Sequence, residues 1–373
     1  MMSSTPLDTA RDLYAELDRA ARELPAEQPL PAEIMTTIDD AGLLGVMVPR
    51  EAGGLELALA DIIDVYAEIA RADGSIGWCY FACDLTAAYF GAYLGDTGRD
   101  ELFGDGVPVM AGQFAPNGVG TPDGDGFLID GDYQFGSGIT HAQWAGAGMF
   151  TAPTDGSDPE YLFACCPADQ VELKGNWDVL GLQSTGSVDY SIRGVHVPAT
   201  RTFDFFFPTI HRGGPMYGLG VLGLTAAGHA GWALGVTRRA LDELAAVART
   251  TTRMGAASSL ADSERFLYEY GRLEGRYRAG VAWTRQVVED AVGEAESTGG
   301  PISDLTLNLL RESCRAVNQG GADIAREAYL LAGTRALRDG PLQRCFRDLH
   351  AGSQHFFANP SAAVDFGRSL LAD

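Results

Sequence analysis

The spacing of apolar residues along the chain changes character twice. Up to about residue 105, apolar side chains recur every three or four positions, which predicts amphipathic helices. Over residues 106–212, short apolar or alternating runs are separated by Gly, Asp, Asn and Pro, which is typical of β-strands. From residue 213 onward the helical spacing returns in long stretches. The pattern therefore predicts an N-terminal helical domain over 1–105, a β domain over 106–212 and a C-terminal four-helix bundle over 213–373.

Two further predictions concern how these elements pack. No long helical pattern interrupts the strands of the β domain, so we expect its sheet to be antiparallel, as a barrel or a sandwich. The fold class is thus mainly α with a central antiparallel β domain. The bundle is expected to consist of four long helices, over residues 217–250, 260–297, 303–331 and 342–370.

One uncharged run, Gly213 to Thr237, is long enough to cross a membrane. It is rich in glycine, contains His229 and lacks aromatic or basic residues on both flanks. We therefore interpret it as a buried core helix rather than as a membrane span.

Composition and charge narrow the class of function. The 373 residues carry a formal net charge of -23, which argues against a nucleic-acid partner and against docking on an anionic membrane. The six cysteines include no CxxC pair, which indicates a reducing compartment. The N-terminal residues lack an apolar signal core, so we expect a soluble, cytoplasmic protein.

A search for three common functional motifs gives little support for dinucleotide binding, a metal site or a serine nucleophile. Gly218–Gly223 matches the dinucleotide pattern GxGxxG, but long helices follow it with no strand between them, so close helix packing explains it better. No HExxH run and no carboxylate–histidine cluster at ligand spacing occurs, so no metal site is expected. The nucleophile elbow GxSxG is also absent.

Two polar segments are better candidates for a site. In the segment from Phe135 to Trp144, small residues would let the backbone approach a planar ligand, and aromatic and polar side chains surround them. The second segment, Ser353-Gln354-His355, lies in an otherwise amphipathic helical pattern. On composition alone, a glycine-rich turn with core aromatics and a structural histidine explain these segments at least as well.

Several short runs resemble, in the same order, signatures of the acyl-CoA dehydrogenase superfamily. The runs are Gly42–Pro49 with Ala52–Gly54, Gly131–Gly138, Leu180–Ser187 with Arg193–Pro198, Arg253–Gly255, and Pro341–Arg344 with Arg347–Asp348. The domain layout of that superfamily also matches the predicted one. The resemblance implies its fold, with an N-terminal helical domain, a β-barrel or sandwich, and a C-terminal four-helix bundle.

The catalytic carboxylate of the dehydrogenases has no counterpart in this chain. In that superfamily a carboxylate base takes the substrate α-proton, and it lies either shortly after the Arg-Asp pair or early in the first bundle helix. No Asp or Glu occurs between Asp348 and Asp365, and none occurs between Thr209 and Asp242. Ser353-Gln354-His355 stands in the first of these positions instead.

These departures resemble the two-component flavin monooxygenases of the same fold, such as the oxygenase components of phenol and hydroxyphenylacetate hydroxylases. Those proteins share a Ser-Gln-His run after the Arg-Asp pair. They also have a Ser-Gly-x-x-His-x-x-Trp run, which the residues from Ser137 to Trp144 match at every fixed position.

The resemblance implies a flavin-dependent monooxygenase that uses reduced FMN or FAD and O2, through a flavin C4a-hydroperoxide. The substrate is expected to be a small aromatic, amine or natural-product compound. A separate NAD(P)H:flavin reductase is implied, because the chain shows no NAD(P)H-binding unit. The resemblance also implies a homotetramer. Two alternatives stay open: an acyl-CoA dehydrogenase-like flavin oxidoreductase, and a family member that has lost redox catalysis.

The resemblance also assigns roles to single residues. Ser137 is expected to hydrogen-bond the hydroperoxide, His355 to act as base or proton relay, and His141 to position the substrate. Substrate binding is assigned to His141, Trp144 and His355. Cofactor binding is assigned to Phe135, Gly136, Ser137, Gln113 and Arg253.

Overall fold

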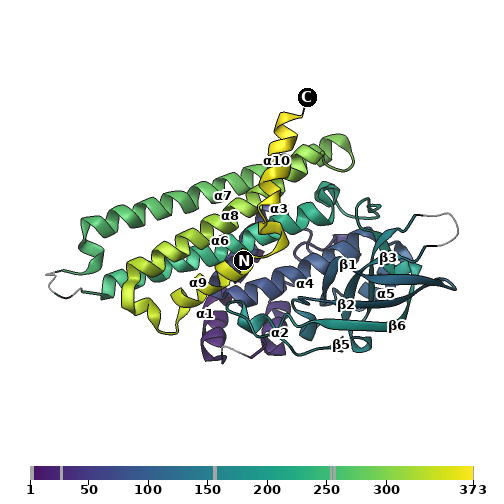
Figure 1. Ribbon diagram of the computed structural model, residues 1–373, viewed down its shortest axis with the longest axis horizontal. Coiled ribbons are helices and arrows are strands. Elements are labelled where there is room, and N and C mark those ends of the chain that lie inside the picture. The colour runs from purple at the N-terminus through teal and green to yellow at the C-terminus, as the bar shows by residue number, and fades with distance from the viewer. Residues whose placement is uncertain (1–3, 26–27, 154–157, 253, 255–257, 373) are drawn as a thin grey trace.

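The computed structural model describes residues 4–25, 28–153, 158–252, 254 and 258–372. Figure 1 shows long helices on one side of the molecule and a β-sheet on the other, with helix α4 between them. The C-terminal helix α10 projects from the bundle. The predicted class, mainly α with a central β domain, is confirmed.

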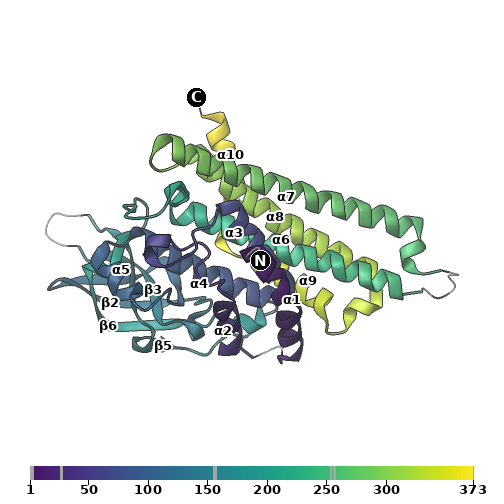
Figure 2. The ribbon, with the colours of Figure 1, turned by 180° about the vertical axis from the view of Figure 1, so that it is seen from behind.

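The N-terminal region consists of helices that pack around one apolar helix, α4. The bounds are α1 Pro6–Glu23, α2 Ala32–Asp40, α3 Leu59–Ala72, α4 Gly74–Tyr93 and α5 Asp96–Phe103. All residues of α4 except Ala82 are buried, as expected for a helix that is apolar on every face. Asp73 caps its N-terminus by accepting hydrogen bonds from the backbone N–H groups of Ser75 and Ile76 at 2.9 and 3.2 Å. Figure 2 shows α1 and α3 from behind, where α3 packs against both α1 and bundle helix α6.

Within the described residues the sheet has seven strands, in the order β5-β6-β2-β1-β3-β4-β7. Their bounds are β1 Met110–Asp123, β2 Gly126–Tyr133, β3 Trp144–Thr151, β4 Tyr161–Pro167, β5 Glu172–Leu173, β6 Tyr190–Pro198 and β7 Thr202–Asp204. Neighbouring strands are antiparallel except β1 and β3, which pair in parallel with Met110 opposite Trp144. The sheet is therefore mixed, and the expectation of a purely antiparallel sheet is wrong.

The parallel pair forms without a helix between its strands. A parallel connection needs a crossover of a dozen or more residues, which is usually helical. Here residues 124–143 provide the crossover, because β2 pairs on one side of β1 and the chain then returns to the other side of β1. A strand that serves as the crossover leaves no helical pattern in the sequence, so the parallel pair could not be predicted from periodicity.

The bundle is built on the buried helix α6 (Gly220–Thr250), together with α7 (Glu264–Thr298), α8 (Asp304–Ala332) and α9 (Pro341–Gly352). Glycine lets α6 touch α3, since a Cβ at Gly235 would lie 2.1 Å from the carbonyl oxygen of Ala67. The helical stretch from residue 215 to 250 is long and apolar enough to cross a membrane, but 89% of its most apolar window is buried inside the structure. The prediction of a buried core helix is confirmed.

The fourth bundle helix is shorter than predicted. Instead of one helix over residues 342–370, α9 ends at Gly352 and α10 (Ser361–Leu371) begins after a turn over residues 353–360. Gly352 lies against α6, where a Cβ would be 2.3 Å from Cη2 of Trp232. Pro360 lacks the N–H that a continuing helix needs. The turn between the two helices contains His355.

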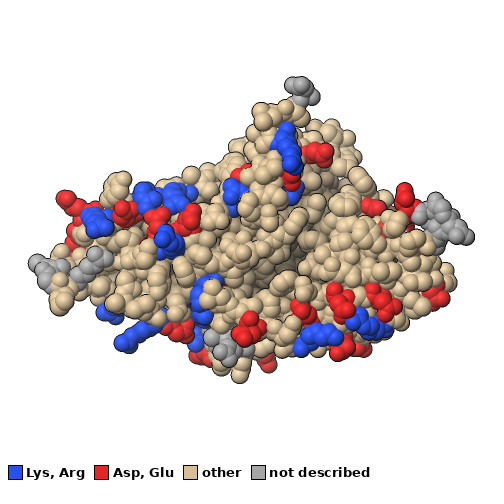
Figure 3. Space-filling view, viewed as in Figure 1, with Lys and Arg blue, Asp and Glu red and all other residues tan. Residues whose placement is uncertain are grey.

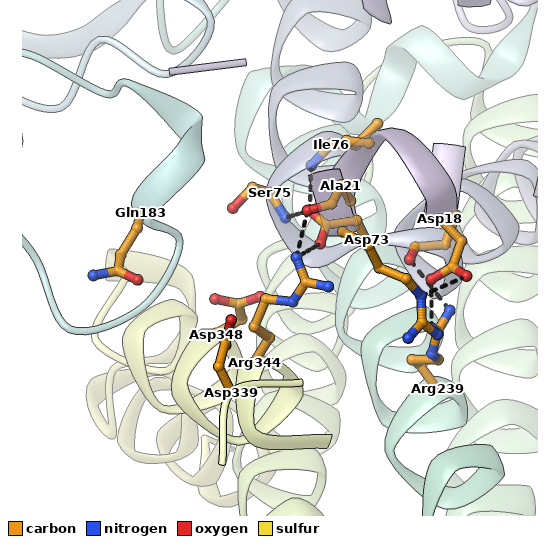
Figure 4. Close-up of polar contacts among 12 residues, drawn as sticks. Asp18, Ala21, Asp73, Ser75, Ile76, Gln183, Arg239, Asp339, Arg344 and Asp348 are labelled. Carbon is orange, nitrogen blue, oxygen red and sulfur yellow. Dashed lines mark hydrogen bonds and ion pairs between the residues drawn. The ribbon is translucent and has the colours of Figure 1, made fainter. Parts of the chain in front are cut away.

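Two hydrogen bonds near the start of α4 fix α9 to the β domain. Figure 4 shows their surroundings, in which Arg344 of α9 pairs with Asp73 at 3.7 Å. The Asp348 carboxylate accepts a hydrogen bond from the backbone N–H of Leu182 at 2.6 Å. Its neighbour Arg347 donates from Nη1 to Oε1 of Gln183 at 2.7 Å. The Arg-Asp pair noted in the sequence therefore connects α9 to a β-domain loop, and so determines where the turn after α9 is placed.

Candidate active site

The segment that follows β2 lies directly against helix α4. Gly136 N–H donates to the carbonyl of Val188 at 3.0 Å, and Gly138 has a left-handed backbone with a φ of +77°. A Cβ at Gly138 would lie 2.5 Å from Sγ of Cys83 on α4. Glycine is needed here both for the backbone angle and for the contact. Ser137, between the two glycines, is thereby held against α4.

The hydroxyl of Ser137 lies in a row of polar groups. The indole N–H of Trp78 on α4 donates to Oγ of Ser137 at 2.9 Å, and the Ser187 hydroxyl lies 2.9 Å from the same oxygen. Ser187 is also 2.8 Å from Oγ1 of Thr185, and it donates its single proton to one of these oxygens at a time. When Ser187 donates to Ser137, both lone pairs of Ser137 Oγ are occupied, and its own hydrogen is free for a ligand.

Trp78 connects Ser137 to two histidines. Its ring makes edge-to-face contacts with His229 on α6, at 5.0 Å between centroids, and with His355 in the turn after α9, at 5.5 Å. The two imidazoles are 5.0 Å apart. Two more rings pack against Trp78, and together they form the aromatic cluster, which consists of Trp78, Phe81, His229, Trp232 and His355. Segments from the β domain and the bundle thus meet at one point on α4.

His355 is half-buried and neutral. Burial lowers the pKa of its imidazole to about 4. The backbone N–H of Phe357 donates to Nδ1 over a long distance of 3.5 Å. Because Nδ1 is the acceptor, the proton of the neutral ring lies on Nε2, which is then a hydrogen-bond donor. In this geometry the basic lone pair is on Nδ1, and Nε2 can take a proton only in the other tautomer.

Phe135 and Gln113 lie beside Ser137 on the β-domain side. Phe135 is 57% exposed, and its left-handed φ of +61° is strained for an aromatic residue, which is typical of ligand sites. Gln113 donates from Nε2 to the carbonyl of Gln134 at 3.3 Å, so its side chain lies along the same segment. Figure 3 shows a hollow with few charged side chains between the bundle and the sheet.

These features fit a flavin, which has a flat apolar ring system with polar edges. The exposed ring of Phe135 offers a stacking surface, Gly136 allows close approach of the backbone, and Ser137 offers a hydroxyl donor. Arg253, which the resemblance assigns to a flavin phosphate, lies outside the described residues.

Two of the predicted site residues lie apart from the aromatic cluster. Among the described residues, no ring contact or hydrogen bond joins the His141 side chain to it. His141 Nε2 is buried without a partner in that part of the chain, and burial lowers the pKa of the ring. Trp144 begins β3, and its ring faces the guanidinium of Arg201 at 4.9 Å. The structure therefore joins Ser137 to His355 through Trp78, and it does not join His141 or Trp144 to them.

Four of the five cluster residues were not assigned to the site from the sequence, and two of them, Trp78 and His229, contact His355. The pattern marks Trp78 only as a core residue of an apolar helix, and His229 only as a polar exception in an apolar run. An indole N–H and an imidazole both need hydrogen-bond partners when they are buried. Because the two apolar helices offer few polar neighbours, the need of Trp78 and His229 for hydrogen-bond partners is the signal that could have identified these two residues.

Comparison with known proteins identifies the family. The family model described as Acyl-CoA dehydrogenase, N-terminal domain matches residues 6–102, and the one described as Acyl-CoA dehydrogenase, C-terminal domain matches residues 227–360. A pigment production hydroxylase from a Rhodococcus species is 30% identical, over 91% of this chain and 89% of its own length. The chain belongs to the acyl-CoA dehydrogenase superfamily.

Other members of the superfamily resemble the chain over almost its full length. An indole-3-acetate monooxygenase from Pseudomonas putida is 28% identical over 98% of this chain and 93% of its own length. Among solved structures, XiaF from a Streptomyces species, in complex with FADH2 and glycerol, has the same fold with a TM-score of 0.88. That structure is 20% identical and covers 99% of this chain and 95% of its own.

As a member of the acyl-CoA dehydrogenase superfamily, the chain departs from the dehydrogenases at the catalytic base. The two carboxylates that flank the turn after α9 are both engaged, since Asp348 accepts from Leu182 and Asp365 pairs with Arg311 at 3.1 Å. His355 is the ionisable side chain that this turn contributes to the aromatic cluster. No group of three or more His, Cys, Asp or Glu in the described part of the chain could hold a metal ion.

Proposed function

We propose that this chain is the oxygenase component of a two-component flavin-dependent monooxygenase that oxygenates a small aromatic substrate. The observation that carries the proposal is the chain of contacts from Ser137 through Trp78 to a neutral His355, at the place where a dehydrogenase has a carboxylate. The monooxygenase and hydroxylase names of the sequence relatives support this reading over the dehydrogenase alternative.

Reduced FMN or FAD is the cofactor that the site residues fit. Phe135, Gly136, Ser137 and Gln113 would hold its ring system, and Arg253 is proposed to face a phosphate. When bound, reduced flavin supplies the electrons that activate O2. The names of related proteins include both FADH2 and FMN, which supports reduced flavin without choosing between the two.

The side chains of this site would do three things. Ser137 donates its hydroxyl hydrogen to the ligand, held by hydrogen bonds from Trp78 and Ser187. The aromatic cluster excludes water, which strengthens every hydrogen bond inside the site. His355 offers its Nε2–H to the substrate as a hydrogen-bond donor, and as a relay it would take up a proton at Nδ1 while it releases the proton on Nε2. The geometry therefore favours the relay role of His355 over that of a simple base.

His141 and Trp144 remain proposals for substrate binding. The buried Nε2 of His141 is available to a ligand, because it has no partner among the described residues. Trp144 has no comparable support, since its ring is already engaged with Arg201.

The proposed partners follow from the reaction. A separate NAD(P)H:flavin reductase would supply the reduced flavin, and the relatives named as an oxygenase subunit and an oxygenase component support such a partner. We expect a homotetramer in the cytoplasm. The six cysteines, all free and buried, support a reducing compartment. Light scattering on the purified chain tests the tetramer.

Rapid mixing tests the function. The reduced-flavin complex is mixed with O2 in a stopped-flow instrument, with and without phenols and indoles, and the products are identified. We expect a spectral phase before oxidised flavin appears, and a product that carries one oxygen from ¹⁸O2. Direct formation of oxidised flavin with every aromatic substrate would contradict the proposal. Anaerobic bleaching of bound oxidised flavin by an acyl thioester would instead support a dehydrogenase.

A further inference from the structure

His229 is a buried polar side chain that the proposed chemistry leaves unexplained. It has 0% of its surface exposed, and neither ring nitrogen has a hydrogen-bond partner among the described residues. Aromatic rings surround it: Phe81 stacks on it at 6.0 Å with the planes 12° apart, and Trp78 contacts it edge-on at 5.0 Å. Two unpaired nitrogens in such a setting are destabilising, and an apolar side chain of similar size would avoid this.

A second imidazole, that of His355, lies beside this ring in the cluster. Their centroids are 5.0 Å apart and their planes are at 88°. At this centroid separation, ring nitrogens that face each other would be about 3 Å apart, which is hydrogen-bond distance; the perpendicular rings would have to turn to reach that arrangement. His355 has little to lose by turning, because the hydrogen bond from Phe357 to its Nδ1 is long, at 3.5 Å.

The electrostatic setting keeps such a pair neutral. Burial, and to a smaller extent the proximity of His355, lower the pKa of His229 well below its ordinary value. A neutral imidazole has one donor nitrogen and one acceptor nitrogen, so His229 can complement either tautomer of its neighbour. In a neutral histidine, the partner of one nitrogen determines which nitrogen carries the proton.

We propose that His229 is a positioning residue, which hydrogen-bonds to the imidazole of His355 and so fixes the nitrogen that carries its proton towards the substrate. His229 itself is covered by the rings of the cluster and acts through His355. The effect on turnover rests on the proposed function, whereas the effect on the tautomer of His355 does not.

Nitrogen NMR tests the tautomer directly. The full chain is labelled with ¹⁵N-histidine, and its six histidines give signals that separate protonated from unprotonated ring nitrogens. The His355 signals are assigned by their loss in His355→Gln. We expect His229→Leu to shift the His355 signals towards a mixture of tautomers at constant pH. Unchanged His355 signals would overturn the inference.

Phe81→Leu is the matched control, because it removes the ring stacked on His229 and keeps the imidazole. We expect it to lower the melting temperature and to leave the His355 tautomer unchanged. A tautomer shift as large as that of His229→Leu would mean that packing alone holds His355, and the inference would be wrong.

Kinetics separate positioning from packing. His229→Leu should lower kcat by about 10–100-fold with little change in KM, the usual effect of losing a group that orients a functional histidine. Its melting temperature should change little, because the loss of the hydrogen bond to His355 offsets the removal of the second, unpaired ring nitrogen. His229→Gln keeps a donor and an acceptor and should recover most of the lost kcat. Equal losses in both variants, or wild-type kcat in His229→Leu, would overturn the inference.

Two outcomes need separate interpretation. If His229→Leu does not fold, His229→Phe carries the NMR test, because it also removes both ring nitrogens: a mixture of His355 tautomers supports the inference, and the wild-type tautomer overturns it. If the wild-type enzyme oxygenates no aromatic substrate, the proposed function fails, and the NMR result still decides whether His229 positions His355.

Discussion

The contact between Gly138 and helix α4 can be tested by adding one methyl group. Gly138→Ala adds two separate costs. The first is the left-handed backbone at a φ of +77°, which costs an L-residue about 1–2 kcal/mol. The second is the position of the new Cβ, 2.5 Å from Sγ of Cys83, and such overpacking costs about 1–3 kcal/mol. The two together predict a loss of about 2–5 kcal/mol in the free energy of unfolding.

Two further variants separate these costs. Gly42 has a similar φ of +71°, but a Cβ there would meet nothing within 4 Å, so Gly42→Ala should show only the backbone cost of about 1–2 kcal/mol. Cys83→Ala removes the sulfur that the new methyl group would strike. In the double variant, Cys83→Ala should therefore recover about 1–3 kcal/mol of the free energy of unfolding that Gly138→Ala loses.

Urea unfolding, monitored by tryptophan fluorescence, provides the free energies of unfolding for this set of variants. The affinity for reduced flavin is measured in parallel, and it should fall in Gly138→Ala because the methyl group moves Ser137 away from its position against α4. The reasoning is refuted if Gly138→Ala costs no more than Gly42→Ala. It is also refuted if Cys83→Ala recovers none of the loss, because the segment would then not lie against α4.

Three further predictions concern the site and its support. Ser137→Ala removes a hydroxyl donor and should lower the rate of product formation by about 10²-fold; an unchanged rate would show that the hydroxyl is not used. Trp78→Phe keeps a ring but deletes the N–H that Ser137 accepts, so it should cost about 1–3 kcal/mol in thermal or urea unfolding, and a wild-type value would contradict the hydrogen bond. Titration should act in opposite directions at Asp348 and His355. Burial and the charge of Asp73 raise the pKa of Asp348, so the folded chain holds a proton that the unfolded chain loses above its pKa of 3.8, and stability falls as pH rises from there. Burial lowers the pKa of His355 from 6.5 to about 4, so its contribution is lost as pH falls through that window. Between about pH 4 and 6.5 the two contributions oppose each other, so the urea midpoint should shift towards a rise with pH in Asp348→Asn and towards a fall with pH in His355→Gln, and unchanged profiles would contradict both assignments.

The sequence allowed the order of elements to be predicted because helix and strand spacing are local properties. Helix α4 is apolar on most faces and buried, and it is the element against which Ser137 and both cluster histidines pack. The mixed sheet was missed because a strand, rather than a helix, makes the crossover from β1 to β3. The break after α9 was missed because the reason for it lies in another helix: Gly352 is required by the ring of Trp232.

By itself, the sequence determined which residues are candidates. The glycines around Ser137, and the histidine that stands where a carboxylate is expected, are properties of the linear chain. Only the tertiary structure decided how they combine. It brought Ser137 to His355 through Trp78, left Trp144 with Arg201, and placed His229 beside His355. The physical reason is that hydrogen bonds and ring contacts act over a few ångströms between residues far apart in the chain. Spacing along a sequence carries no information about such contacts until the helices and strands have packed.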